Sequence, residues 1–237
     1  RPISVLSALA ATVVSGAAAF AQASKPALDS ATLAGFRWRT VGPANFEGRV
    51  ADVVGIPSPS KTFFVAAAGG GIWKTTNAGT TFRPMFDDYP VVAMGALAIA
   101  PSDTQQVWAG TGEQNSRNTI EPGQGIYKST DGGLTWKLIG LEKTQHIGRI
   151  AVHPTNPNIV YFGGVNGGVW RSDNALAATP TWTPLTDAQP SQSIGGLALD
   201  RGNPNVIIAG TGRWSSFFQD GGQNGLLLIS QNGGAET

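Results

Sequence analysis

The sequence predicts an all-β protein, and within that class a β-propeller made of four-stranded blades. One four-strand pattern occurs four times along the chain, at the spacing of propeller blades. The repeated region lacks the 3.6-residue apolar periodicity of helices. Glycine accounts for 32 of the 237 residues, as expected where many short strands are joined by tight turns. About four blades are present, and we expect them to be part of a larger propeller.

Each repeat is centred on a segment that begins with glycine, and successive starts are 54, 43 and 57 residues apart (Gly71, Gly125, Gly168 and Gly225). Two β-rich segments precede each glycine, and a short segment led by an aromatic residue follows three of them. We name the four predicted strands A to D in chain order. Strand A is expected at 52–56, 96–100, 149–153 and 196–200, strand B at 62–66, 106–109, 159–162 and 206–209, and strand D at 82–85, 136–139 and 182–185. Strand A is rich in glycine and alanine, which fits the crowded axis where blades converge.

The N-terminal region predicts export. Residues 1–23 combine a basic first residue, an uncharged alanine-rich stretch and Ala21-Gln22-Ala23, the pattern of a signal peptide and its cleavage site. A linker (24–34) precedes residues 35–237, the blades. Residues 35–43 resemble an isolated strand D, and the fourth repeat is incomplete. Either the chain closes a four-bladed ring or it is the N-terminal fragment of a longer propeller, and we favour the fragment.

Composition excludes several classes of site. Sixteen basic and fifteen acidic residues leave no basic footprint for nucleic acid. Cysteine is absent, so neither disulfides nor thiolate metal sites are possible. No histidine has metal-ligand spacing, and we expect no metal, no cofactor and no stable membrane anchor after signal cleavage. The expected location is secreted or periplasmic.

The segment Ser129-Thr-Asp-Gly-Gly-Leu-Thr-Trp136 resembles the Asp-box, or BNR repeat, of sialidases, sortilin-type propellers and xyloglucan-cleaving glycosidases. The whole repeat region most resembles large secreted bacterial BNR-repeat proteins, often labelled glycosyl hydrolase or sortilin-like. The resemblance implies a structural motif that caps the turn between strands C and D, not a catalytic site. The positions it implies are Asn77, Gly79, Phe82, Ser129, Asp131, Gly133, Trp136, Asn232 and Gly234.

Propeller geometry places the starts of the A strands and the B–C loops on one rim, and the long B–C loops (112–125 and 212–225) favour binding there. The candidate ligand-binding residues are Glu47, Arg49, Asp52, Glu113, Asn115, His146, Arg149, Arg213, Trp214 and Asp220. Asp52 and Arg149 are predicted at equivalent positions, where they form an ion pair or contact ligand. Glu113 and Arg213 follow two Thr-Gly copies, and this charge reversal predicts a side chain that points outward. Trp214 either stacks on sugar or packs within its own loop.

Two functions remain open. The first is an extracellular scaffold that binds glycan or protein through the rim. The alternative is a segment of a xyloglucanase- or sialidase-like glycoside hydrolase, with Asp52 and Glu113 as candidate acids and the remaining acids in missing blades. Xyloglucan-cleaving relatives carry an aspartate just before strand C, whereas 67–71 and 165–168 contain no carboxylate. The arginine triad of sialidases is not recognisable either, and Phe36-Arg-Trp-Arg39 poorly matches their early Phe-Arg-Ile-Pro segment. Expected partners are polysaccharide or extracellular protein.

Overall fold

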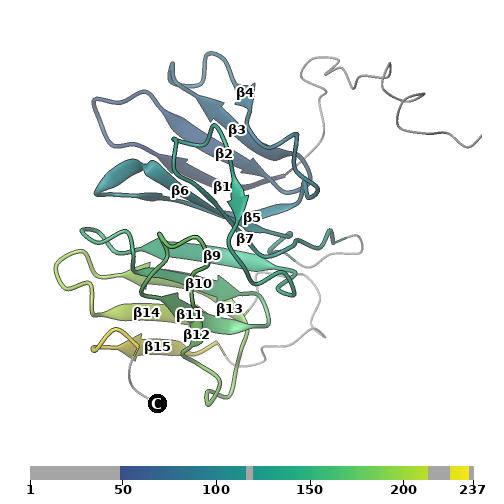
Figure 1. The fold of residues 1–237 in the computed structure, drawn as a ribbon. Helices are drawn as coiled ribbons and strands as arrows, with labels where there is room; N and C mark the ends of the chain where they lie inside the picture. Colours follow the sequence, from purple (N-terminus) through teal and green to yellow (C-terminus); the bar gives the residue numbers. More distant parts are fainter. Residues whose placement is uncertain (1–48, 116–119, 213–224, 235–237) are drawn as a thin grey trace, which may run out of the picture. The chain divides into compact units, whose positions relative to one another are not determined.

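The computed structural model describes residues 49–115, 120–212 and 225–234. The predicted signal peptide, linker and strand at 35–43 lie outside these ranges. The described residues form fifteen strands and no helix (Figure 1). The first two sheets contain β1 (Val50–Gly55), β2 (Phe63–Ala67), β3 (Gly71–Thr75) and β4 (Arg83–Pro84), then β5 (Met94–Ala100), β6 (Asp103–Thr111), β7 (Ile126–Ser129) and β8 (Lys137–Leu138). The next two contain β9 (Ile147–Val152), β10 (Val160–Gly164), β11 (Gly168–Ser172) and β12 (Thr183–Pro184), then β13 (Ile194–Leu199), β14 (Ile207–Thr211) and β15 (Leu227–Ser230).

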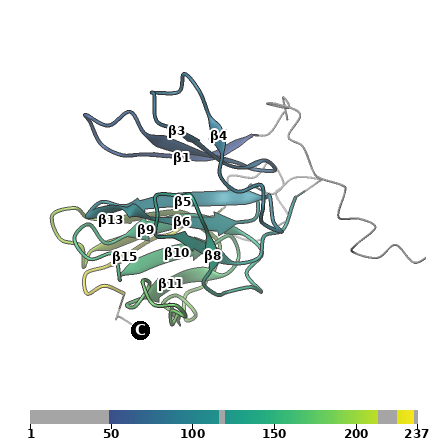
Figure 2. The same ribbon diagram turned by 45° about the horizontal axis from the view of Figure 1, so that its top comes forward.

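Every sheet is an antiparallel meander in chain order, which is the topology of a propeller blade. We call the sheets blades 1 to 4. The first strands of the blades, β1, β5, β9 and β13, contact one another in succession, so they are the innermost strands, as the sequence predicts (Figures 1 and 2). The all-β, partial-propeller prediction is therefore confirmed.

The innermost strands approach so closely that side chains are excluded between them. A Cβ atom on Gly95 of β5 would lie 2.2 Å from the carbonyl oxygen of Ile147 in β9. Because real contacts of a Cβ atom are essentially never below 3.0 Å, this position accepts only glycine. The small residues of strand A are thus explained by the spacing of the blades.

Each inner strand also contains a register irregularity near its start. The shift lies between Val50 and Asp52 in β1, and the same shift recurs opposite the ends of β6, β10 and β14. A bulge redirects the side chain that follows it. Asp52 and Arg149 occupy equivalent positions after it, as predicted, opposite Ala66 and Gly163.

The hydrophobic core is divided into three clusters between successive blades. Phe64, Phe86 and Trp136 join blades 1 and 2, whereas Trp108, Ile147 and Phe162 join blades 2 and 3. A smaller cluster of Val169, Ile194 and Ala209 joins blades 3 and 4. The aromatic residue before strand D packs into this wedge in blade 2, where Trp136 is buried against the ring of Phe86 of blade 1.

The turn between β7 and β8 is held by a network around Asp131. Its Oδ1 accepts hydrogen bonds from the Ser129 hydroxyl (2.7 Å) and from the amides of Leu134 and Thr135 (both 2.9 Å). Oδ2 accepts one from the Thr135 hydroxyl (2.6 Å). Burial alone raises the pKa of the Asp131 carboxyl, but these hydrogen bonds outweigh burial and the pKa lies below its ordinary value. Asn77, Asn174 and Asn232 take the same place in the other blades.

A cation on strand C connects each of the first three blades to the next blade. Lys74 donates to the carbonyl of Gly132 (2.6 Å), and Arg171 donates to that of Gly233 (2.5 Å). Lys128 is buried and donates to the carbonyls of Ala175 (3.0 Å) and Ala177 (3.2 Å). Burial lowers the pKa of Lys128, and Lys137 opposite it adds to this. We call this contact the cation clamp.

We expect Asp131→Ala to lower the free energy of unfolding by about 1–2 kcal/mol at neutral pH, because several charge-assisted hydrogen bonds are lost. The lowered pKa means that the stabilisation is complete above about pH 4 and is lost as the pH falls through the folded-state value. Asp131→Asn, which copies the other blades, should flatten that acid dependence. Urea unfolding from pH 2 to pH 7 measures both, and an Asn variant with the acid profile of the natural protein would contradict the assignment.

Lys128→Met should destabilise the protein by about 1–3 kcal/mol, because the carbonyls of Ala175 and Ala177 lose their donor. Lys137→Met is the matched control, since Lys137 lies opposite Lys128 and is exposed. Thermal unfolding of both variants provides the comparison. Equal decreases in the melting temperature of Lys128→Met and Lys137→Met would show that loss of a positive charge, and not loss of the clamp, causes the destabilisation.

Candidate functional site

The starts of the inner strands and the β6–β7 loop lie on one rim, where the ion pair between Arg49 and Glu113 joins blade 1 to blade 2. Arg49 Nη2 lies 2.9 Å from Glu113 Oε2, with side-chain exposures of 41% and 2%. The prediction that Glu113 points outward is therefore wrong. A buried carboxylate is tolerated at position 113 because Arg49 of the neighbouring blade pairs with it.

Gln114 connects three blades. Its Nε2 donates to the Ala51 carbonyl of blade 1 (3.0 Å), and its Oε1 accepts from Arg149 Nη1 of blade 3. Arg149 also donates to the carbonyl of Gly148 (2.7 Å). Gln114 lies in the long 112–125 loop but is not among the residues selected from the sequence, because nothing local marks a glutamine whose partners lie 63 and 35 residues away.

Asp52 is engaged within the scaffold. Its Oδ2 accepts from the Leu97 amide of blade 2 (2.8 Å), and its Oδ1 accepts from the amide of Val53 (2.9 Å). No ion pair joins Asp52 to Arg149, both of which are described. Asp52 therefore links β1 to β5, and Arg149 interacts with Gln114 instead.

Glu121 brings an exposed carboxylate to the same rim. Its main-chain carbonyl accepts from the Glu113 amide (3.1 Å), which fixes the returning part of the β6–β7 loop. A Cβ atom on Gly69 would lie 3.4 Å from Glu121 Oε2, so this carboxylate lies beside the β2–β3 turn of blade 1. Glu121 lies in the long 112–125 loop but is not among the candidates selected from the sequence.

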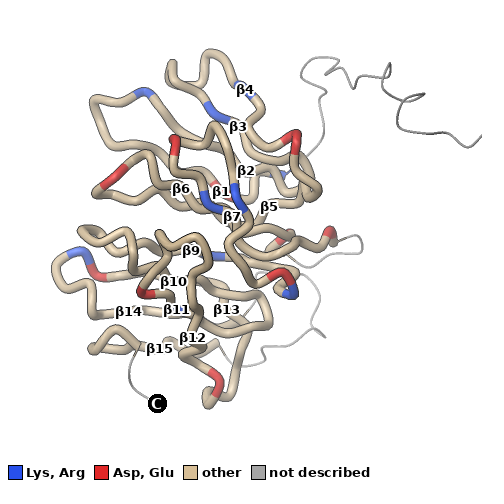
Figure 3. Tube along the Cα trace, viewed as in Figure 1, with Lys and Arg blue, Asp and Glu red and all other residues tan. Residues whose placement is uncertain are grey.

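The other candidates fall into two groups. Asn115 is exposed, and half-buried His146 accepts a hydrogen bond from the Val165 amide through its carbonyl (3.0 Å). Glu47, Arg213, Trp214 and Asp220 lie outside the described residues. Acidic and basic positions are interspersed along the described trace (Figure 3).

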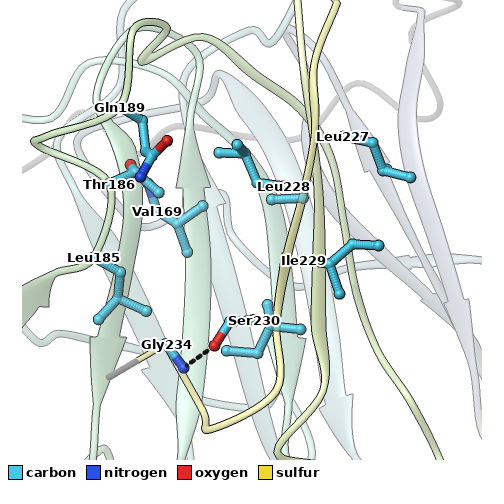
Figure 4. Close-up of a pocket in the computed structure, with 11 residues that line it drawn as sticks. Val169, Leu185, Thr186, Gln189, Leu227, Leu228, Ile229, Ser230 and Gly234 are labelled. Carbon is cyan, nitrogen blue, oxygen red and sulfur yellow. Dashed lines mark hydrogen bonds between the residues drawn. The ribbon is translucent and has the colours of Figure 1, made fainter. Parts of the chain in front are cut away.

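Two pockets among the described residues lie away from this polar rim. One, of about 510 Å³, is lined by inner-strand residues such as Leu97, Ile150 and Leu199. The other, of about 260 Å³, separates Val169 and Leu185 of blade 3 from Leu228 of blade 4 (Figure 4). Within the described ranges there is no cluster of residues suited to a metal ion, and no helix long and apolar enough to cross a membrane.

Comparisons with known proteins relate the chain to glycoside hydrolases. No protein-family model matches it. It is 29% identical over 187 residues to a xyloglucanase of Hypocrea jecorina, covering 68% of this chain and 22% of that protein. It is 25% identical over 196 residues to a xyloglucanase of a Paenibacillus species, covering 73% and 18%. Xyloglucanase Xgh74A of Acetivibrio thermocellus is 24% identical over 189 residues, covering 64% and 21%. The chain thus spans about a fifth of the length of these relatives.

Solved structures support the same fold. The GH74 enzyme of Niastella koreensis superposes with a TM-score of 0.58 at 24% identity, covering 77% of this chain and 28% of that one. The GH74 xyloglucanase of Xanthomonas campestris gives a TM-score of 0.59 at 18% identity, covering 79% and 29%. At these identities the likeness establishes the fold alone.

We expect Gln114→Ala to lower the free energy of unfolding by about 1–2 kcal/mol, because two hydrogen bonds between blades are lost. Asn115→Ala is the control. Asn115 is the exposed neighbour of Gln114, and its replacement should change the free energy of unfolding by less than about 0.5 kcal/mol. Chemical denaturation of the two variants distinguishes them, and a stable Gln114→Ala protein would argue against a three-blade link.

Proposed function

We propose that the chain is a propeller segment of a secreted glycoside hydrolase of the xyloglucanase type, and that its rim faces a polysaccharide. The main support is sequence similarity to xyloglucanases of three different organisms over 64–73% of the chain. That similarity coincides with a propeller fold and with a polar rim built from three successive blades. The export signal predicted for residues 1–23 is consistent with a polysaccharide substrate outside the cell.

The C–D turns support assignment of the blades to the Asp-box class. The Ser129 hydroxyl accepts from the Gly133 amide (2.7 Å), as the Ser230 hydroxyl does from the Gly234 amide (2.8 Å). Figure 4 shows the latter bond at the end of β15. These turns stabilise the blades and take no part in the proposed chemistry.

The carboxylates of the rim are proposed to have different roles, some structural and one catalytic. Glycosidic hydrolysis uses a pair of carboxyl groups that flank the scissile bond. Asp52 and Glu113 are held by the Leu97 amide and by Arg49, so we assign them to positioning of the rim. Among the described residues, Glu121 is an exposed carboxylate on this rim, and we propose it as the acid that contacts substrate. Its partner carboxylate is assigned to blades beyond those described.

A non-catalytic scaffold that binds glycan is the second candidate. The observation that favours it is the engagement of Asp52 and Glu113 within the scaffold, which leaves no facing pair of carboxylates identified on the described rim. Both candidates predict that the protein binds glycan, but only the hydrolase predicts that it cleaves it.

The protein produced from its complete natural gene should release reducing ends from xyloglucan, and Glu121→Gln should lower kcat at least about 100-fold, because proton transfer by a positioned group contributes that much. Reducing-sugar assays and product chromatography measure this. Asp173→Asn is the control, since Asp173 forms a surface ion pair with Arg171 and should leave kcat unchanged.

The scaffold alternative has a different outcome. Xyloglucan binding by affinity electrophoresis without hydrolysis by the complete protein would favour it. If the Glu121→Gln variant hydrolyses xyloglucan with an unchanged kcat, the protein is a hydrolase but Glu121 is not its catalytic acid. Absence of both binding and hydrolysis would overturn both candidates.

A further inference from the structure

The cation clamp is accompanied by an aromatic partner in each of the first three blades. The residue opposite the cation on strand B is Phe64 for Lys74, Trp108 for Lys128 and Tyr161 for Arg171. Lys74 Nζ lies 5.2 Å from the centre of the Phe64 ring, and the Arg171 guanidinium carbon lies 5.5 Å from that of Tyr161. The face that each of these blades presents to the next therefore contains an aromatic residue and a cation opposite each other.

The acceptor on the next blade is equally regular. In all three interfaces the cation meets the carbonyl that directly follows the Asx residue of the C–D turn, at Gly132, Ala175 and Gly233. The corresponding residue of blade 1 is Ala78, after Asn77. Ala78 has a φ of 57°, close to the 66° of Gly132 and the 73° of Gly233. Its backbone is therefore shaped as in two of the three turns that receive a cation, those of blades 2 and 4.

Blade 1 presents this receiving face without a preceding blade among the described residues. Ala78 is exposed, and its carbonyl accepts no hydrogen bond from the described residues. Phe82 is 41% exposed, whereas the equivalent Trp136 is 6% exposed beneath blade 1. Val53 on β1 is also 54% exposed. Blade 1 therefore has both parts of the receiving face, the apolar side chains of Phe82 and Val53 and the carbonyl of Ala78, and both are exposed.

Blade 4 lacks the complementary face. The pair equivalent to aromatic and cation is Ile208 and Ile229, which lie opposite each other on β14 and β15. They are 36% and 53% exposed. Figure 4 shows Leu228 directed toward Val169 of blade 3, and Ile229 on the opposite side of β15. An isoleucine cannot donate to a carbonyl, so blade 4 does not match the receiving face of blade 1.

We infer that the open face of blade 1 docks a β-sheet that carries an aromatic–cation pair, and that this sheet is neither blade 4 of the same chain nor blade 4 of a second copy. The three internal interfaces define the chemistry of the partner. It presents Lys or Arg on one strand to the Ala78 carbonyl, and it covers Phe82 with apolar side chains. The same argument speaks against a four-bladed ring closed by blades 4 and 1, because Ile229 cannot donate to that carbonyl.

Photo-crosslinking of the protein produced from its complete natural gene tests this inference. Ala78 is replaced by benzoylphenylalanine, and the crosslinked peptides are identified by mass spectrometry after irradiation. We expect a peptide that contains Lys or Arg on a predicted strand, with an aromatic residue opposite it on the preceding strand. Substitution of that Lys or Arg by Met should remove most of the crosslinked product.

The same probe at Leu134 is the control, because Leu134 is an exposed residue on the C–D turn of blade 2, whose neighbours are known. It should react only within blades 1 and 2. Crosslinking of position 78 to residues 225–234, within one chain or between two copies, would overturn the inference. A product without a basic residue would overturn it too, and so would no product at position 78 when the Leu134 probe reacts.

Discussion

The contact between the backbones of β5 and β9 at the propeller axis governs the rest of the structure. Because Gly95 has no room for a methyl group next to the Ile147 carbonyl, the blades are in contact at their inner edges and diverge outward. The gap between them widens from strand A to strand D, and larger side chains are needed to fill it. Trp108 and Phe162 on strand B, and Trp136 beside strand D, are among the side chains that fill it. The cation clamp then closes the outer part of the gap with a hydrogen bond.

The same inner strands also determine where the charged side chains of the rim point. The bulge near the start of each A strand turns the next residue, and in blades 1 and 3 that residue is charged. Asp52 and Arg149 therefore interact with neighbouring blades, through Leu97 and Gln114. The polar groups of the rim therefore connect successive blades. Glu121 and Asn115 of the β6–β7 loop are exceptions, because both are exposed.

The sequence alone predicts the fold well because the repeat is local. Each blade is a contiguous meander, so its strands follow from glycine, aromatic and β-branched residues within about 45 positions, as residues 125–139 illustrate. The site is less predictable because its contacts are not local. Glu113 is buried by a partner 64 positions earlier, and Gln114 acts across three blades. Lys128 looks like an ordinary exposed lysine of a strand, and only the adjacent blade shows that it is buried.

The cation clamp has a consequence for the order in which the protein acquires its structure during synthesis. The acceptor of Lys74 lies 58 residues later, and those of Lys128 and Arg171 lie 47 and 62 residues later. A blade that leaves the ribosome therefore carries a cation without its carbonyl partner until the next C–D turn has been made, and each blade is completed by its successor. This dependence runs in one direction, from the N-terminus to the C-terminus. It stops at Ile229, where the outgoing face has no charge to satisfy.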